Sequence, residues 1–477
     1  MSNFMLKFKF GLKSRLGLIP GTSRMEVQDM ALKKEYDEFL GYEESKEPQR
    51  FIELEEIVTS QDFRDRKKYI QNQRFKKTDA YEKLMDYRSM KKTPEFKGYF
   101  RFISSKYYPD FHKFDNSEEV RKLLAAGKDA DKDKELSKLK KSPGIKAYFK
   151  LSKSKDLDYF RIIHDSPELK KFNELENYLN SDEFREIKEY MESKDKFIKS
   201  PEYKQLREYQ QIKKSKKHKW YNKVKKSGKF DELKKWELSF FDDFKGKEID
   251  NNKWLTSFYW GKQLLKNNYS LASDQHLYTD GNNIEIQDSM LKLYTRKEKV
   301  TGQAWDPSIG FFPKEFEYTS GIINTGESFR QQYGAFEAKV RMRRSPSVHH
   351  AFWMVSDKMV PHIDIFRFSG KNKKRIELNS FREKPGKPED ITSSSDQVGG
   401  LDFSKGFFIY RLEWYPDRMV WKINNTVVKT QRHYIPEEPM YILFSSGVSG
   451  EEAVNGLPTS LDIDWVRCYS YMGDTSN

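Results

Sequence analysis

The hydrophobic pattern of the sequence changes near Trp236, and this change limits the possible fold more than any other feature. Before it, apolar residues recur every three or four positions, which is typical of amphipathic helices. After it, apolar and polar residues alternate in short runs between turn residues, which is typical of strands that bury one face. At 477 residues the chain is also too long for a single core. We therefore expect a multidomain protein, with an α-helical region followed by a β-sandwich.

The helical region repeats a short signal that starts helices. Ser or Thr caps the free backbone amides, Pro fits the first helical position, and an acidic residue favours the positive end of the helix dipole. The signal or a close variant occurs at residues 60–63, 93–96, 142–145, 166–169, 181–184 and 200–203. The spacing is irregular and matches no standard repeat period. We predict an N-terminal arm over 1–30 and then an array of short α-helices over 31–236. Its aromatic residues would form its own core, and the array can also anchor the chain to a protein partner.

The excess positive charge lies in this first region. Residues 1–236 contain 57 Lys and Arg against 41 Asp and Glu, whereas the rest of the chain contains 31 against 32. The densest basic stretch, 213–229, includes Trp220 and Tyr221, a combination that can bind nucleic acid. No nucleic-acid-binding fold accompanies it, so we interpret the stretch as a solvated helix face that leads into a linker.

Cysteine content and hydropathy limit the possible compartments. Cys468 is the only cysteine, so the chain forms no intrachain disulfide. No stretch approaches the length of about 18 apolar residues that a membrane span needs. Residues 1–20 lack the unbroken apolar core of a signal peptide. We expect a protein of the cytoplasm, or part of an assembled particle or surface structure, without a membrane span.

The second region, 237–472, has the short, turn-separated strands of an antiparallel sandwich or jelly roll, with a short tail at 473–477. The expected strands include 283–286, 290–295, 334–342, 351–355, 407–414, 419–423 and 463–469. One further alternating stretch, 361–368, concentrates ionisable groups. His362 and Asp364 share a face, whereas Arg367 points away in a regular strand. Only a β-bulge, which adds one residue to a strand, would bring the three together.

Several segments of this region, taken in order and spacing, resemble glycoside hydrolase family 16, which includes laminarinases, lichenases, agarases and carrageenases. The matching segments are 240–244, 318–325, 333–338, 351–353, 410–417, 439–441 and 464–467. The resemblance implies a concanavalin A-like β-jelly roll with a sugar-binding cleft over 237–472. It also implies that 362–367 corresponds to a bulged catalytic strand, which in the family carries a Glu nucleophile, an Asp that tunes it and a Glu acid/base.

Both catalytic glutamates of the family are replaced, because His362 and Arg367 stand at their positions and only Asp364 is retained. Retaining hydrolysis needs two carboxyl groups about 5–5.5 Å apart. Arginine stays charged and cannot donate a proton. We therefore expect no catalytic residues and no family-type hydrolysis. A relocated acid/base from a loop, such as Glu383 or Glu451, would instead give an active endo-glycosidase.

The expected cleft can still bind carbohydrate through aromatic faces and polar groups. The candidates are Trp260, Trp305, Trp353, His349, His350, His362 and Arg367. Core packing is the competing role for the tryptophans, least so for Trp305, which lies in a polar loop. The basic residues would make a cationic cleft for an anionic glycan. Alternatively, Arg367 pairs with Asp364 and closes the site, which is the interpretation we prefer.

We expect no cofactor, although Asp464 lies where some family members bind a structural calcium. The preferred hypothesis is a non-catalytic, lectin-like domain that binds a poly- or oligosaccharide and is carried on a helical anchoring module. One alternative is a structural or assembly protein that uses the sandwich for protein contacts. The other is a hydrolase of a β-glucan or galactan with a relocated acid/base.

Overall fold

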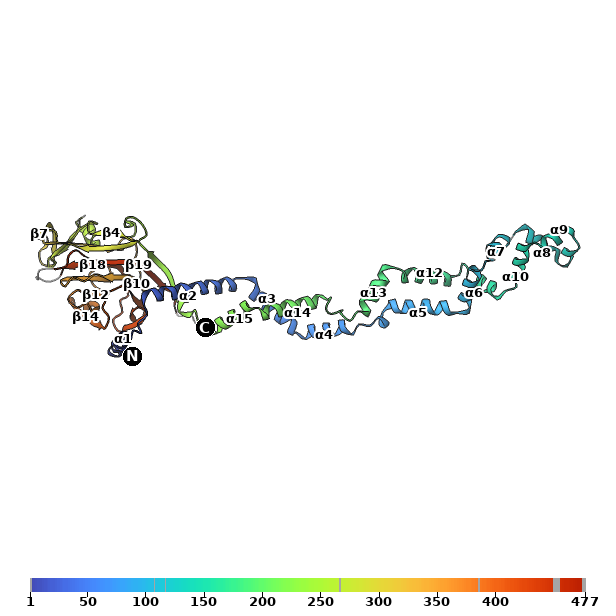
Figure 1. Cartoon of the computed structure of the whole chain (residues 1–477), viewed down its shortest axis with the longest axis horizontal. Helices are drawn as coiled ribbons and strands as arrows, with labels where there is room; N and C mark the ends of the chain where they lie inside the picture. Colours follow the sequence, from blue (N-terminus) through green and yellow to red (C-terminus); the bar gives the residue numbers. More distant parts are fainter. Residues whose placement is uncertain are drawn as a thin grey trace. The chain divides into compact units, whose positions relative to one another are not determined.

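The computed structural model describes residues 2–106, 108–115, 117–265, 267–384, 387–448 and 455–473. The chain divides into two compact units. One comprises Met1–Gly41 with Lys223–Asn477, and the other comprises Tyr42–Asn222. The first unit contains the β-sandwich and the second is helical (Figure 1). This division differs from the expected arm at 1–30 and helical domain at 31–236, because both ends of the expected helical region belong with the sandwich.

Two antiparallel sheets form the sandwich, as expected from the alternating pattern. The first sheet has the order β17-β16-β15-β10-β19-β5-β4, and β1 also pairs with β19. Its strands are β1 (Trp236–Asp242), β4 (Ile284–Gln287), β5 (Met290–Thr295), β10 (Gly334–Met342), β15 (Phe408–Trp414), β16 (Met419–Ile423), β17 (Thr426–Gln431) and β19 (Thr459–Tyr471).

The second sheet has the order β14-β13-β12-β11-β18-β9. Its strands are β9 (Ile322–Asn324), β11 (Val348–Val355), β12 (His362–Ser369), β13 (Arg375–Lys384), β14 (Lys387–Gly399) and β18 (Tyr441–Val448). All the strands expected from the sequence are present, although β11 and β19 begin three or four residues earlier. Between the sheets lies one large apolar core, in which the stacked rings of Phe352 and Phe444 are 4.3 Å apart.

The expected N-terminal arm is folded against the sandwich. Helix α1 (Asn3–Arg15) packs on β17 and β14, and its Phe10 is fully buried in the core between the sheets. The side-chain oxygen of Asn3 accepts a hydrogen bond from the backbone of Thr430 at 2.9 Å. The next helix, α2 (Thr22–Glu43), buries Met25 against residues of the first sheet. Helix α1 and most of α2 therefore belong to the same compact unit as the sandwich.

A further layer lies on the second sheet. It is made of α17 (Tyr259–Leu264), β2 (Tyr269–Leu271), β3 (His276–Tyr278), β6 (Val300–Asp306), β7 (Gly310–Phe316) and β8 (Tyr318–Ser320). Its strands form two small sheets, in which β2 pairs with β6 and β3 pairs with β8 in parallel. These parallel pairs were not expected from the sequence.

The helical unit is an antiparallel double row of short helices (Figure 1). Returning helices lie beside outgoing ones, with α14 against α3, α12 against α5 and α11 against α6. The helices of this region are α3 (Lys46–Thr59), α4 (Gln61–Asn72), η1 (Phe75–Lys77), α5 (Asp79–Lys92), α6 (Pro94–Ile103), α7 (Tyr108–Phe114), α8 (Glu118–Ala126), η2 (Gly127–Asp131), α9 (Lys134–Lys140), α10 (Pro143–Leu151), α11 (Lys155–Ile163), α12 (Pro167–Leu179), α13 (Asp182–Glu192) and α14 (Pro201–Lys214); α15 (Lys216–Ser227) and α16 (Asp231–Lys234) follow.

All six helix starts predicted from the sequence are confirmed. They begin α4, α6, α10, α12, α13 and α14. In each, the Ser or Thr side chain before the helix accepts a hydrogen bond from a backbone N–H of the first turn, as a helix cap does. None of the described helices is both long and apolar enough to cross a bilayer.

Candidate functional site

The predicted β-bulge is present in β12. Phe352 of β11 pairs with Phe366, but the next residue, Trp353, pairs with Asp364, so Ile365 is the extra residue. Ile365 and Phe366 both lie in the core between the sheets. The bulge therefore places His362, Asp364 and Arg367 together on the face of the sheet that points away from this core, as predicted from the sequence.

Asp364 is at the centre of this face and is only 1% exposed. One carboxylate oxygen accepts a hydrogen bond from Nε2 of His362 and the other from the side-chain amide of Asn379, both at 2.8 Å. The ion pair expected between Arg367 and Asp364 is not found among the described residues. Sharing a face does not bring the guanidinium to the carboxylate, whose oxygens are bound by two other side chains.

His362 is held between two aromatic rings. Its ring stacks on Trp353 with centroids 4.8 Å apart and meets the edge of Phe381 at 5.2 Å. The indole N–H of Trp353 donates a hydrogen bond to the hydroxyl of Ser445 at 3.1 Å. Trp353 itself is 7% exposed, so it serves as a packing surface for His362 rather than as an open platform.

The layer over the second sheet explains the burial of Trp353. An apolar cluster joins Phe258, Tyr269 and Tyr278 of that layer to residues of β11 and β18. Trp260 and Trp305 are partly buried against the same cluster, and the indole N–H of Trp260 donates to the carbonyl of Asp357 at 2.7 Å. The structure thus brings the three candidate tryptophans to one covered part of the sheet.

Two of the candidate histidines are poor cations. His349 is partly buried near Arg367, and burial together with that positive charge lowers its pKa well below the usual value. His350 is fully buried beside Phe368 on the core face, and burial lowers its pKa to about 4. Its Nε2 donates to the carbonyl of Arg343 at 2.9 Å. The structure does not bring His350 to the cleft face, so of the four basic residues expected there only His349, His362 and Arg367 share that face.

The part of the sheet beyond His362 is more polar and more open. Across β13 and β14, Phe381 pairs with Ser393, and Asn379 pairs with Ser395. Ser393 and Ser395 are exposed and share a face with the site, as does Gln397 two residues further on. Such a strip of hydroxyl and amide groups next to aromatic rings suits the hydroxyls of a sugar.

Sequence reasoning missed Asn379, which completes the hydrogen bonding of Asp364. Its place on the site face follows from the alternation of buried Ile376 and Leu378. Its position beside Asp364 depends on the register between β12 and β13, which the sequence does not reveal. His276 was also missed. It is fully buried, with Nδ1 accepting from the backbone of Val448 at 3.1 Å.

The other expected carboxylates have different environments. Glu383, near the end of β13, is 3.9 Å from the ammonium of Lys358. Glu451 lies outside the described residues. Asp464 pairs at 2.6 Å with Lys339, which also contacts Glu26. No group of three or more possible metal-binding side chains is found in the part of the chain that the structure describes.

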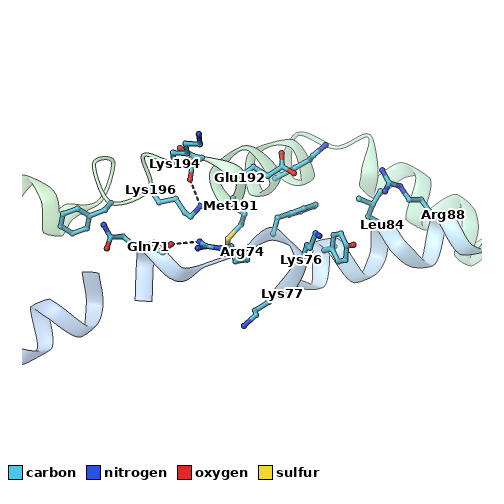
Figure 2. Close-up of a pocket in the computed structure, with 15 residues that line it drawn as sticks. Gln71, Arg74, Lys76, Lys77, Leu84, Arg88, Met191, Glu192, Lys194 and Lys196 are labelled. Carbon is cyan, nitrogen blue, oxygen red and sulfur yellow. Dashed lines mark hydrogen bonds between the residues drawn. The ribbon is translucent and has the colours of Figure 1, made fainter. Parts of the chain in front are cut away.

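The helical unit has a separate basic concavity of about 960 Å³ between α4–α5 and α13–α14. Figure 2 shows Arg74 and Lys196 reaching into it from the two facing rows. Its lining also includes Lys76, Lys77, Arg88, Lys188 and Lys194 but only one carboxylate, Glu192. In the described part of the chain, none of these cations forms an ion pair. Arg74 and Lys196 are instead hydrogen-bonded to backbone carbonyls.

Comparison with known proteins gives the domain a family. Residues 271–467 match the model for glycosyl hydrolases family 16. The C-terminal region is a family 16 domain. An endo-1,3-1,4-beta-glycanase, ExsH, of Rhizobium meliloti is 27% identical over 33% of this chain and 35% of its own length. A glucan endo-1,3-beta-glucosidase A1 of Niallia circulans is 21% identical over 49% of this chain and 37% of its own length. The kappa-carrageenase of Pseudoalteromonas carrageenovora is 23% identical over 41% of this chain and 58% of its own length.

Among solved structures, the catalytic domain of an endo-1,3-beta-glucanase from Thermotoga petrophila is 20% identical, covers 50% of this chain and 99% of its own, and has a TM-score of 0.41. The chain spans only about a third of the first two curated relatives named here. The shared region is the family 16 domain, and the family match does not extend into the helical unit.

Proposed function

We propose that the family 16 domain binds a poly- or oligosaccharide on the polar part of the second sheet and does not hydrolyse it by the two-carboxylate mechanism. The bonding of Asp364 is the observation that carries this proposal. Its side chain is 1% exposed, and both oxygens accept hydrogen bonds from protein groups. A carboxylate in this state has no free oxygen to present to an anomeric carbon.

The remaining members of the set cannot replace the missing carboxyl groups. Arg367 is a guanidinium, a group that does not act as a proton donor to a leaving group. His362 directs Nε2 at Asp364 and is clamped between Trp353 and Phe381. Retaining hydrolysis needs two carboxyl groups about 5–5.5 Å apart. Asp364 is buried and bonded by two side chains, and Glu377, a further carboxylate of this face, lies opposite Arg367 and accepts a hydrogen bond from Gln397 at 3.5 Å. Binding is the function that these side chains still support.

A neutral β-glucan is the ligand class that we propose. The relatives named above are glucanases and a carrageenase. His350 faces the core and burial lowers the pKa of His349 well below its usual value, so Arg367 is the main cation that this face offers to a sulfated glycan. The exposed Ser393, Ser395 and Gln397 instead offer hydroxyl and amide groups to sugar hydroxyls.

Affinity electrophoresis of the full chain in laminarin, lichenan and κ-carrageenan tests this proposal. We expect retardation by a neutral glucan and an approximately tenfold weaker interaction for Ser395→Arg, which places a bulky side chain on the proposed strip. Ser308→Arg, an exposed serine in the turn between β6 and β7, is the matched control and should bind as the wild type does. No retardation by any of the three polysaccharides would exclude carbohydrate binding. Stronger retardation by κ-carrageenan would show that the preferred ligand is a sulfated glycan rather than a neutral glucan, and carbohydrate binding itself would stand.

A reducing-sugar assay on the same three polysaccharides tests the absence of hydrolysis. We expect the wild type to release no reducing sugar. Release would instead support the alternative of a hydrolase with a relocated acid/base. The double substitution His362→Glu with Arg367→Glu restores two carboxyl groups on either side of Asp364. Activity in this variant would show that the glutamates alone are missing. Continued inactivity would show that the covering layer also prevents productive binding.

For the helical unit we propose docking of an acidic protein segment, because the concavity in Figure 2 gathers cations without ion pairs. The full chain should bind a fluorescent poly-glutamate peptide in a salt-sensitive manner. Arg88→Glu with Lys188→Glu should abolish that binding, whereas Arg121→Glu with Lys146→Glu, outside the concavity, should not. Equal binding by both variants would assign any binding to overall charge and reject the site. The alternative function for the helical unit is a role in assembly through protein contacts.

A further inference from the structure

Helix α1 has two apolar faces, and only one of them is covered. The inner face contains Phe10, which is buried in the core between the sheets, and Lys7, which pairs with Asp396 at 2.6 Å. On the opposite face, Phe4, Phe8, Leu12 and Leu16 recur at intervals of four, so they form one stripe along the helix. Phe4 is 78% exposed, Phe8 65% and Leu16 61%. We call these four residues, with Met5 beside them, the α1 stripe.

The α1 stripe differs from the scattered apolar residues that any surface carries. Each of its five residues is at least 48% exposed, and they cover adjoining positions on little more than three helical turns. Leu18, just beyond the helix, is 61% exposed and extends the same apolar surface. Contiguous exposed apolar patches of several hundred Å² generally mark an interaction site. The inner face holds the helix in place, so the stripe persists without a partner to order it.

Charge identifies the kind of partner. Residues 1–25 contain five Lys or Arg residues and no Asp or Glu. Lys9 and Arg15 lie beside or within the stripe, and neither forms an ion pair in the described part of the chain. Two copies of the helix packed stripe to stripe would bring these cations together without a counter-charge, which disfavours self-association. An anionic lipid bilayer complements both the apolar stripe and the cations beside it, because its acyl region is apolar and its headgroups are negatively charged.

We propose that the α1 stripe binds the surface of an anionic membrane, with α1 lying in the plane of the headgroups. Phe4, Phe8, Leu12 and Leu16 enter the acyl boundary, and Lys9, Lys13 and Arg15 contact lipid phosphates. This attachment places the helix on the bilayer rather than through it, which agrees with the lack of a membrane-spanning helix among the described residues. The attachment uses no residue of the glycan site.

Vesicle co-sedimentation of the full chain tests this proposal. Vesicles of phosphatidylcholine with about one-third phosphatidylglycerol should bind the wild type at least about tenfold more tightly than phosphatidylcholine alone. Phe4→Glu with Phe8→Glu should reduce binding to the anionic vesicles by about tenfold or more, because it places two carboxylates in the acyl boundary. Phe4→Leu with Phe8→Leu should retain binding. Leu124→Glu with Ile162→Glu makes the same change at two exposed apolar residues of the helical unit and should have no effect.

Both Phe side chains are exposed, so unchanged thermal unfolding of the Glu variant serves as the folding control. Failure of the wild type to bind anionic vesicles would overturn the proposal. Equal binding by the wild type and the Phe4→Glu, Phe8→Glu variant would do so as well. If sedimentation instead shows an oligomer of the wild type that the variant abolishes, without vesicle binding, the stripe binds a second copy of the chain and the membrane proposal is wrong.

Discussion

The sandwich and the helical unit fill their interiors in different ways. The sandwich has one continuous core that joins Phe10 of α1 to Cys468 of β19. The helical unit has several small clusters, each made by a few neighbouring helices, such as the one around Phe96 and Phe172. A defect in a continuous core should be felt throughout the sandwich, whereas a defect in one helical cluster should remain local. The predictions that follow test this contrast.

Phe10→Ala should have the largest effect. Removing a fully buried aromatic ring from a core costs about 3–5 kcal/mol, and here it would lower the stability of the whole sandwich. Eight of the nine tryptophans lie in the unit that contains the sandwich, so fluorescence-monitored unfolding in urea reports mainly on that unit. Phe8→Ala, on the exposed face of the same helix, should change stability by less than about 0.5 kcal/mol. Similar losses for the two variants would show that α1 is not part of the core.

Acid should weaken the sandwich through His350. Its pKa in the folded protein is about 4, against about 6.5 in an unfolded chain, so below pH 6.5 the unfolded chain binds a proton that the folded protein excludes. The free energy of unfolding should therefore fall as the pH falls from 6.5 to 4, by at most about 3 kcal/mol from this group. Burial lowers the pKa values of His276 and His349 in the same direction.

Urea titrations across this pH range measure the slope. His350→Leu should flatten it, because the variant removes an imidazole that must stay neutral to remain buried. His433→Leu, at an exposed position in the same unit, is the matched control. A slope that is identical in the wild type and His350→Leu would show that His350 is not what makes the sandwich acid-sensitive.

The sequence contained the local features of both units. Helix starts depend on a cap and a first turn, and strands depend on alternation, so both can be predicted from neighbouring residues. The bulge at Ile365 was predictable because three polar groups needed a common face. Alternation also implies that His349 and His350, adjacent in one strand, face opposite sides. Only one of them could therefore have reached the cleft.

The rest of the site depends on contacts that no local pattern encodes. Phe10 belongs to the core because α1 packs on strands about 400 residues away in the sequence. Trp353 is covered because Phe258, Tyr269 and Tyr278 fold over it. Asp364 is bonded to Asn379 rather than to Arg367 because of the register between β12 and β13. Each of these outcomes is decided by long-range packing, which overrides the local preference of any one segment.

Phe172→Ala tests the other side of the comparison. Phe172 is buried in a small cluster, with its ring 5.0 Å from Phe96 and 4.8 Å from Tyr87. We expect a loss of about 2–3 kcal/mol that is confined to α5, α6 and α12, below the usual range because a small cluster can collapse around the gap. Amide hydrogen exchange should show faster exchange in these helices only, and exposed Ile162→Ala should leave them unchanged. Faster exchange throughout the sandwich would contradict separate cores.

Ser200→Ala should have the smallest effect and tests whether the repeated helix-start signal stabilises one helix at a time. The Ser200 hydroxyl accepts from the backbone of Tyr203 at 3.2 Å and donates to the carbonyl of Phe197 at 2.7 Å. Losing this cap should cost about 1 kcal/mol, seen as faster hydrogen exchange in the first turn of α14. Ser137→Ala, inside α9, removes no cap and should be neutral or slightly stabilising, because alanine has the higher helix propensity. Equal effects of the two substitutions would show that the signal reflects composition rather than capping.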